Sequence, residues 1–213
     1  MVVIDLSHKL ANGMQIYPGD PHFSIVPWNI HEKDGCQVDK ILMGSHSGTH
    51  IDAPWHIDTQ GAKMDEIPVN RFIGNGVLVD VTGKGSGESI GIDDLTPVID
   101  QIKPEDFLIF HTGWDRFFGQ KAYLKHPYIS PDLADKILHM EVSLVGIDTL
   151  SVDPTGTNIF ATHEALMPSR ILIVENLCNL QSVPQTRGIY SFLPLKLNGS
   201  DGSPVRAVFM DYS

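Results

Sequence analysis

The sequence predicts an α/β protein in which layers of β-sheet are covered by helices on one side. Short apolar runs with strand-like patterning outnumber the segments with helical periodicity, and the helical segments fall in the middle of the chain. A length of 213 residues is enough for a sizeable core and is most simply explained by a single domain over residues 1–213.

The first part of the chain is predicted to be mostly extended. Residues 2–6 form an apolar run, and residues 23–26 and 37–43 alternate in the manner of strands. Between them, residues 14–21 read Met-Gln-Ile-Tyr-Pro-Gly-Asp-Pro, a loop whose shape is fixed by its prolines and glycine. Tyr17 at the tip of this loop is a candidate substrate contact, although a half-buried packing role explains a tyrosine there equally well.

The middle of the chain alternates strands with helical segments. Residues 76–81 and 107–111 are compact apolar runs of the kind found in buried strands. Apolar residues at helical spacing over 92–102 predict a short amphipathic helix that ends before Pro104. A second helix is expected over residues 130–140, because it starts with a cap serine, a proline and an aspartate.

Further elements follow towards the carboxyl end. The expected elements are, in order, a strand at 144–148, one or two helical turns at 162–167, a strand at 171–174, and strands at 188–195 and 204–210. The loop after residue 148 is rich in Asp, Ser and Pro. An active-site wall and ordinary turns explain that loop equally well.

A histidine-rich stretch, residues 45–56, is the first candidate site. Its sequence is Ser-His-Ser-Gly-Thr-His-Ile-Asp-Ala-Pro-Trp-His, and all of its ligand-type side chains are at even positions, which an extended backbone points to one face. A helix would align the first two histidines but not the aspartate, and Pro54 blocks its continuation. We therefore expect a strand running into a turn, with Gly48 leaving room for a metal. A histidine-rich surface loop is the less favoured alternative. The residues concerned are His46, His50, Asp52 and His56.

A second candidate lies at the end of the most apolar strand. Glu175 follows residues 171–174 directly, and a buried acid is costly unless a cation or a hydrogen-bond partner compensates for its lost hydration. His163, in the preceding helical segment, is the next candidate.

Composition excludes several classes of partner. The formal net charge is −11 and no run of Lys or Arg overrides it, so neither nucleic acid nor a membrane surface is an expected partner. No apolar stretch approaches membrane-spanning length, and the amino terminus lacks the features of an export signal, so a cytoplasmic location is expected. Cys36 and Cys178 lie far apart in the sequence and are expected to be free thiols.

The histidine stretch also carries a family resemblance. Residues 46–56 match the pattern H-x-G-T-H-x-D-x-P-x-H of the cyclase family, whose best-known members are bacterial kynurenine formamidases. Supporting motifs are Tyr-Pro-Gly-Asp-Pro, Gly-Ile-Asp-Thr, Ser-Val-Asp and Gly-Ser-Pro-Val-Arg-Ala-Val. The resemblance implies a three-layer β/β/α domain of the swivelling-domain type. It also implies a homodimer or homotetramer, and one or two divalent metals, with zinc favoured over manganese.

The resemblance implies roles for individual residues as well. By position, the implied metal ligands are His46, His50, Asp52, His163 and Glu175. The first three would hold one metal and His163 a second, with Asp52 and Glu175 bridging the two. His56 would be the proton donor and acceptor. One departure is Tyr17, which stands where formamidases of this type carry a tryptophan that meets the aromatic substrate.

The expected activity is metal-dependent hydrolysis of the amide carbon–nitrogen bond of a small molecule. An aromatic acyl-amine such as N-formylkynurenine would be attacked by metal-activated water, with a histidine shuttling the proton. The alternatives are a cyclic amide such as isatin, or a ring-closing dehydration. A non-catalytic structural metal is less favoured, because such sites are usually closed by four ligands and often by cysteine.

Overall fold

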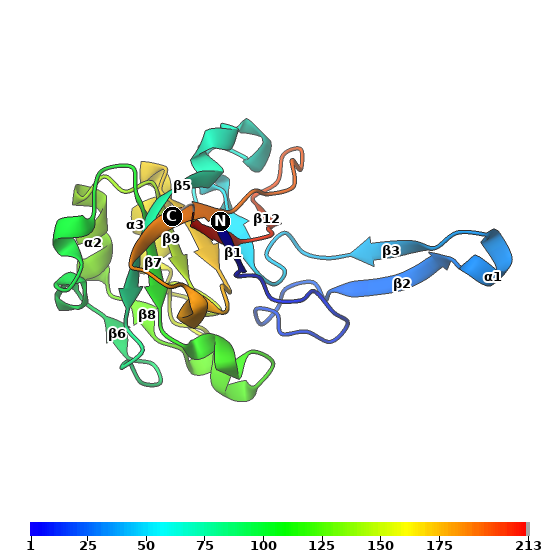
Figure 1. Ribbon diagram of the computed structural model, residues 1–213, viewed down its shortest axis with the longest axis horizontal. Helices are drawn as coiled ribbons and strands as arrows, with labels where there is room; N and C mark the ends of the chain where they lie inside the picture. Colours follow the sequence, from blue (N-terminus) through cyan, green and yellow to red (C-terminus); the bar gives the residue numbers. More distant parts are fainter. Residues whose placement is uncertain (212–213) are drawn as a thin grey trace.

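The structure, a computed structural model, describes residues 1–211 and is built on a nine-stranded mixed sheet (Figure 1). Its four central strands run parallel, and the strands on both flanks are antiparallel to their neighbours. In spatial order the strands are β1 (Val2–Asp5), β13 (Val208–Asp211), β11 (Arg187–Ser191), β5 (Ile73–Asp80), β7 (Phe107–His111), β9 (Leu144–Ile147), β10 (Leu172–Glu175), β4 (His50–Asp52) and β12 (Gly202–Pro204).

The expected helix around residues 130–140 is confirmed as α2 (Pro131–His139). The hydroxyl of Ser130 accepts a hydrogen bond from the Leu133 N–H at 3.2 Å, as an N-cap should. The expected helical turns at 162–167 are confirmed as α3 (Ala161–Leu166), although the helix starts one residue earlier than expected.

The prediction of an amphipathic helix over residues 92–102 is wrong. The structure has two 3-10 turns there, Ile92–Leu95 and Ile99–Gln101. Pro97 lies between them, and its ring and missing N–H prevent a continuous helix despite the helical spacing of the apolar residues. The remaining 3-10 turns are Pro54–His56, Met64–Glu66, Val69–Phe72, Trp114–Phe117, Lys121–Lys125, Met167–Ser169 and Leu180–Ser182.

The sheet has an apolar core on each face. Leu108 and Phe110 of β7 belong to a cluster that includes the buried residues of α2 and α3, whereas Phe107 and Ile109 belong to a second cluster. That second cluster contains side chains of β4, β11 and β13, because the sheet curls round it. The helices therefore cover one side and sheet faces sheet on the other, which confirms the predicted α/β class with three layers.

A two-stranded arm projects from the body on the side away from α2 (Figure 1). It consists of β2 (Ser24–Asn29), the short helix α1 (His31–Asp34) and β3 (Val38–Leu42). A second small pair, β6 (Ser89–Ile90) and β8 (Tyr128–Ile129), is parallel. Among residues 1–211, no helix has the length and apolar character needed to span a bilayer.

Candidate metal centre and active site

The histidine-rich stretch is less extended than expected. Only residues 50–52 form a strand, followed by a 3-10 turn at 54–56, so the expected strand running into a turn is correct for 50–56 alone. The chain turns at Gly48, which has a φ of +64°. Nevertheless, the turn brings His46 back to Asp52, with 2.7 Å between Nδ1 and Oδ1.

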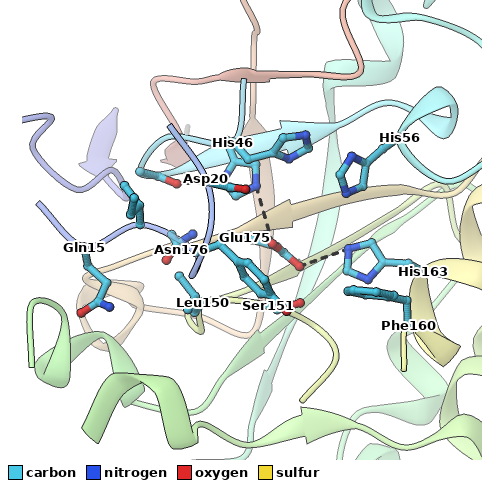
Figure 2. Close-up of a pocket in the computed structure, with 14 residues that line it drawn as sticks. Gln15, Asp20, His46, His56, Leu150, Ser151, Phe160, His163, Glu175 and Asn176 are labelled. Atoms are coloured by element: carbon cyan, nitrogen blue, oxygen red, sulfur yellow. Dashed lines mark hydrogen bonds and ion pairs between the residues drawn. The ribbon is translucent and has the colours of Figure 1, made fainter. Parts of the chain in front are cut away.

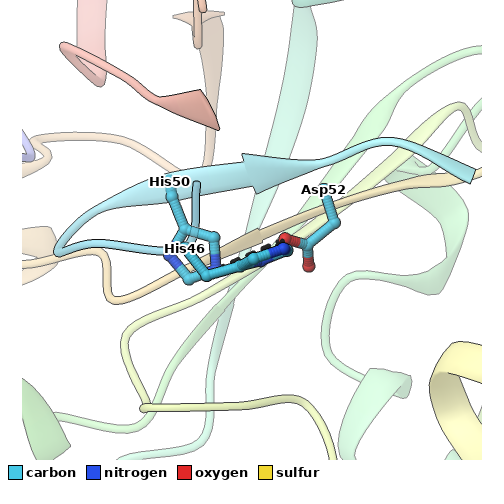
Figure 3. A group of neighbouring side chains, drawn as sticks. All are labelled: His46, His50 and Asp52. Atoms are coloured by element: carbon cyan, nitrogen blue, oxygen red, sulfur yellow. Dashed lines mark ion pairs between the residues drawn. The ribbon is translucent and has the colours of Figure 1, made fainter. Parts of the chain in front are cut away.

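The first group of donor atoms comes from β4 and the turn before it (Figure 3). His50 and Asp52 are two residues apart on a strand, so their side chains share a face. His50 Nε2 lies 3.3 Å from Asp52 Oδ1, the same oxygen that His46 approaches. The ligand atoms of these three residues all lie within 4.8 Å of one another, close enough to share one ion.

A second group shares Asp52 and adds residues from the far end of the chain. Antiparallel pairing of β10 with β4 places Glu175 opposite His50, with 3.5 Å between Oε2 and Nε2. His163 Nε2 lies 3.4 Å from Glu175 Oε1 and 3.7 Å from Asp52 Oδ2. Figure 2 shows Glu175 and His163 meeting at the wall of a cavity. The five residues predicted as metal ligands are thus brought together around Asp52.

The tautomers implied by the hydrogen bonds would point three lone pairs at a cation in this cluster. In each ring one nitrogen faces an oxygen acceptor outside the cluster: His50 Nδ1 faces the Gly48 carbonyl at 2.8 Å, and His163 Nδ1 faces Asp153 at 2.7 Å. In His46, Nε2 faces the Asp201 carboxylate at 3.1 Å. A ring nitrogen beside an acceptor holds a hydrogen, so if a cation displaced the protons between the rings and the Asp52 and Glu175 oxygens, the inner nitrogens would turn lone pairs to the cluster.

The cluster is buried and short of hydrogen bonds, which fits a cation. Asp52 is 0% exposed, and its oxygens have only the imidazole nitrogens of His46, His50 and His163 beside them, at 2.7 to 3.7 Å, with no backbone or hydroxyl donor among residues 1–211. A buried carboxylate whose neighbours are neutral rings carries a large desolvation penalty. A divalent ion among these nitrogen and oxygen donors would remove that penalty.

The electrostatics of the cluster favour positive charge. Burial opposes the charged form of His46, but the negative charges of Asp52 and Asp201 outweigh the effect of burial and raise the pKa of His46 to about 10. Burial likewise opposes a charge on Asp52, yet His46 and His50 hold its pKa well below the usual range. A bound cation would take the place of the protons on the rings, because metal ligands must be deprotonated.

Two buried aspartates near the cluster have different functions. Asp153 accepts hydrogen bonds from the backbone N–H and the ring of His163, so it fixes this histidine at the start of α3. Asp148 accepts from the backbone and hydroxyl of Thr112 and from the Gly113 N–H, which makes it a structural anchor for that turn.

An open cavity of about 220 Å³ lies next to the cluster. His46, His50, His56, His163 and Glu175 reach it from the cluster side. Apolar and aromatic walls come from Ile16, Tyr17, Leu150 and Phe160. Tyr17 therefore lines the cavity, as a substrate contact would, although a contact with substrate stays a prediction.

Sequence reasoning missed Asp201, the second carboxylate beside His46. Its Oδ2 lies 3.1 Å from His46 Nε2 and 3.2 Å from His56 Nδ1. In the sequence it is one acid in a Gly/Ser turn at residues 198–202, next to the Gly-Ser-Pro-Val-Arg motif. Only the pairing of β12 with β4, which sets Gly202 opposite Asp52, brings it to the histidines.

The sequence of this chain is similar to one protein family and to curated members with one activity. The profile of the family described as "Putative cyclase" matches residues 4–154. Kynurenine formamidase of Geobacillus thermodenitrificans (strain NG80-2) is 36% identical over 205 residues, which are 96% of this chain and 95% of that protein. The kynurenine formamidase of Bacillus anthracis is 34% identical over 206 residues, with the same two shares.

Solved structures share the fold. A potential metal-dependent hydrolase with cyclase activity superposes with a TM-score of 0.83 at 30% identity, covering 100% of this chain and 98% of that one. Isatin hydrolase A from Labrenzia aggregata superposes with a TM-score of 0.91, covering 100% and 94%, but at 22% identity it speaks for the fold alone. With a profile match over most of its length and relatives above 30% identity across nearly all of it, this chain belongs to the putative cyclase family, as its histidine motif predicted.

Proposed function

We propose that the substrate is a small aromatic acyl-amine, such as an aryl formamide of the N-formylkynurenine type, cleaved at its amide carbon–nitrogen bond. The chain is a metal-dependent amide hydrolase of the putative cyclase family. The observation that carries the proposal is the buried cluster of histidines and carboxylates around Asp52, of which His46, His50, His163 and Glu175 line a cavity with aromatic walls.

The proposed cofactor is zinc, as one or two ions, with manganese as the alternative. The residues that would hold it are His46, His50, Asp52, His163 and Glu175. Imidazole nitrogen and carboxylate oxygen without thiolate suit both metals. When bound, a divalent metal lowers the pKa of a coordinated water to roughly 7 and stabilises negative charge that develops on the carbonyl oxygen.

His56 is the proposed proton carrier. An amine leaves poorly as an anion, so its nitrogen must gain a proton as the carbon–nitrogen bond breaks. Of the four histidines that line the cavity, His46, His50 and His163 contact Asp52, whereas His56 contacts Asp201. Its ring centroid lies 5.9 Å from that of His163, on the cavity side of the cluster.

The cavity walls support an aromatic acyl-amine. Tyr17 and Phe160 lie on the wall, and Phe160 meets the edge of His163 with 6.3 Å between ring centroids. Tyrosine at position 17 offers a smaller surface than the tryptophan of the formamidases, so the proposal covers aryl formamides as a class. A cyclic amide of the isatin type is the second candidate, since the fold is shared with isatin hydrolases.

A hydrolysis panel with metal analysis tests the function. We expect the metal-loaded protein to cleave N-formylkynurenine or a simple aryl formamide faster than isatin, and a chelator to abolish the activity. The variant His56→Ala should lose turnover by 100-fold or more while its metal content stays at the wild-type level. Normal rates in this variant, or loss of all its metal, would refute the role of His56.

A homo-oligomer, dimer or tetramer, is also proposed. The arm bears exposed apolar side chains, of which Trp28 is 70% and Leu42 63% exposed. Apolar patches of this kind commonly mark interaction surfaces. The cytoplasmic location and the exclusion of nucleic-acid and membrane partners stay predictions.

A further inference from the structure

Asp201 connects two histidines that have different functions in the proposed reaction. One carboxylate oxygen, Oδ2, contacts both His46 Nε2 and His56 Nδ1, at 3.1 and 3.2 Å. The other, Oδ1, accepts a hydrogen bond from the Ser45 hydroxyl at 2.8 Å. The two imidazole rings lie side by side, with 4.1 Å between their centroids.

The charge of Asp201 decides where the ring protons are. A carboxylic acid side chain is ordinarily ionised at neutral pH, and three donors lie within 3.2 Å of the Asp201 oxygens. An ionised carboxylate only accepts hydrogen bonds, so both ring nitrogens that face it must carry hydrogen. In a neutral ring, His46 then keeps a lone pair on Nδ1, beside Asp52, and His56 keeps one on Nε2.

The backbone fixes Asp201 in this position. Its carbonyl accepts a hydrogen bond from the Ala53 N–H at 2.8 Å, next to the ligand strand. The turn before it is tied to Asp65, whose Oδ1 accepts from the Gly199 N–H at 2.8 Å. The residue after it, Gly202, pairs with Asp52 in the sheet. The carboxylate is therefore held by three backbone contacts on a short loop.

We propose that Asp201 is a positioning residue that holds His56 in the Nδ1–H tautomer, so that its free Nε2 can carry the proton of the reaction. This inference rests on the proposed function. Nε2 takes the proton released by the attacking water as the new carbon–oxygen bond forms. It then gives that proton to the amine nitrogen as the carbon–nitrogen bond breaks, which leaves a carboxylic acid and a neutral amine. Through His46, the same carboxylate orients one ligand of the metal cluster.

The test compares two substrates that carry the same formyl group. An aryl formamide needs a proton on its leaving nitrogen, whereas a nitrophenyl formate releases a stable phenolate without one. The variant Asp201→Asn keeps the size of the side chain and removes its charge. Both substrates need the proton of the attacking water to be removed, but only the formamide also needs a proton on its leaving group. With both proteins saturated with metal, we expect kcat on the formamide to fall about 100-fold with KM unchanged, and kcat on the ester to fall about 10-fold or less.

Two further proteins complete the design. Asp135→Asn makes the same change on the exposed side of α2, where it touches neither His46 nor His56, and we expect both activities to remain within 3-fold of wild type. In the background His56→Ala, we expect Asp201→Asn to add less than a 3-fold loss on the formamide, because residues that act as a unit are not additive.

Several outcomes would overturn the positioning role. These are an unchanged kcat in Asp201→Asn, equal losses on both substrates, a loss of activity that disappears when metal is restored, and an effect in Asp135→Asn as large as that in Asp201→Asn. Wild-type protein that cleaves neither substrate would refute the proposed function, and the inference with it. Wild-type protein that cleaves both, with a normal Asp201→Asn, would refute the inference alone.

Discussion

His8 is a half-buried imidazole outside the metal cluster, and it makes the stability of the protein depend on pH. Its ring stacks on Phe118 with 3.8 Å between centroids, and its Nε2 has no hydrogen-bond partner. Burial lowers its pKa to about 4 from the usual 6.5, against the attraction of Asp115. The unfolded chain therefore binds a proton at a higher pH than the folded chain does, and stability is lost as pH falls from 6.5 towards 4.

The expected size of this effect is about 3 kcal/mol in full, from a shift of roughly 2.5 pH units. Replacing His8 with Phe keeps the stacked ring and removes the titration. Urea unfolding of both proteins at pH 7.5 and pH 4.5 measures this effect. Between these two pH values, the free energy of unfolding of the wild type should fall by about 2 to 3 kcal/mol more than that of His8→Phe. Because other groups titrate in both proteins, parallel losses would show that His8 does not carry the effect.

At the level of single residues, the candidate metal ligands could be predicted from the sequence, but the residue that contacts and orients their histidines could not. The parity of His46, His50 and Asp52 and the burial cost of Glu175 follow from local sequence, and the structure gathers these side chains. Asp201 has no comparable local signal, since one acid in a Gly/Ser turn resembles any solvated turn. Its contacts depend on strand pairing between residues about 150 positions apart.

The pairing of β4 with β12 requires a residue without a side chain at position 202. A Cβ added to Gly202 would lie 2.9 Å from His46 Cε1 and 3.1 Å from the Ile51 carbonyl oxygen. We expect Gly202→Ala to push the His46 ring out of the cluster and weaken metal binding about 10- to 100-fold, as disturbance around metal ligands commonly does.

Competition with a chromophoric chelator measures this affinity. The matched control is Gly83→Ala, because a Cβ on Gly83 would meet nothing within 4 Å and its φ is not in the left-handed region. The control should keep wild-type affinity, and far-UV circular dichroism should show both variants folded. Equal metal affinity in all three proteins would contradict the steric argument.

At the level of elements, predictions succeeded where one local signal dominated. Ser130 and the proline after it fix the start of α2, and apolar runs predicted the parallel strands β7 and β10. The prediction of a helix at 92–102 was wrong because it followed the helical spacing of the apolar residues. Pro97 interrupts the backbone hydrogen bonds of a helix whatever that spacing is. The position of β4 between β10 and β12 could not be predicted, since sheet order follows from packing along the whole chain.

For the whole molecule, the arm is the part that the fold leaves without cover. Val26 pairs with Lys40 and Ser24 with Leu42, two residues away on each strand, so Val26 and Leu42 share one face of the arm. Trp28 lies at a register shift in β2, and its contact with Lys40 places it beside this face. Val26, Trp28 and Leu42 are 45%, 70% and 63% exposed, and Lys40 lies beside Trp28 at 5.9 Å from its ring centroid. Burying a large apolar side chain is worth about 1.5 to 3 kcal/mol, so this face would stabilise an oligomer if a second copy covered it.

For the whole molecule, we predict that charged substitutions on this face of the arm dissociate the oligomer into monomers. We expect the wild type to sediment as a dimer or tetramer, and the double variant Trp28→Asp with Leu42→Lys to sediment as a monomer at the same concentration. Ile92→Lys is the control, because Ile92 is 44% exposed but lies outside the arm. Since β2 and β3 pair only with each other, the variant should keep the fold of the sheet and its metal. A monomeric wild type, or an unchanged mass in the double variant, would show that the arm does not hold copies of the chain together.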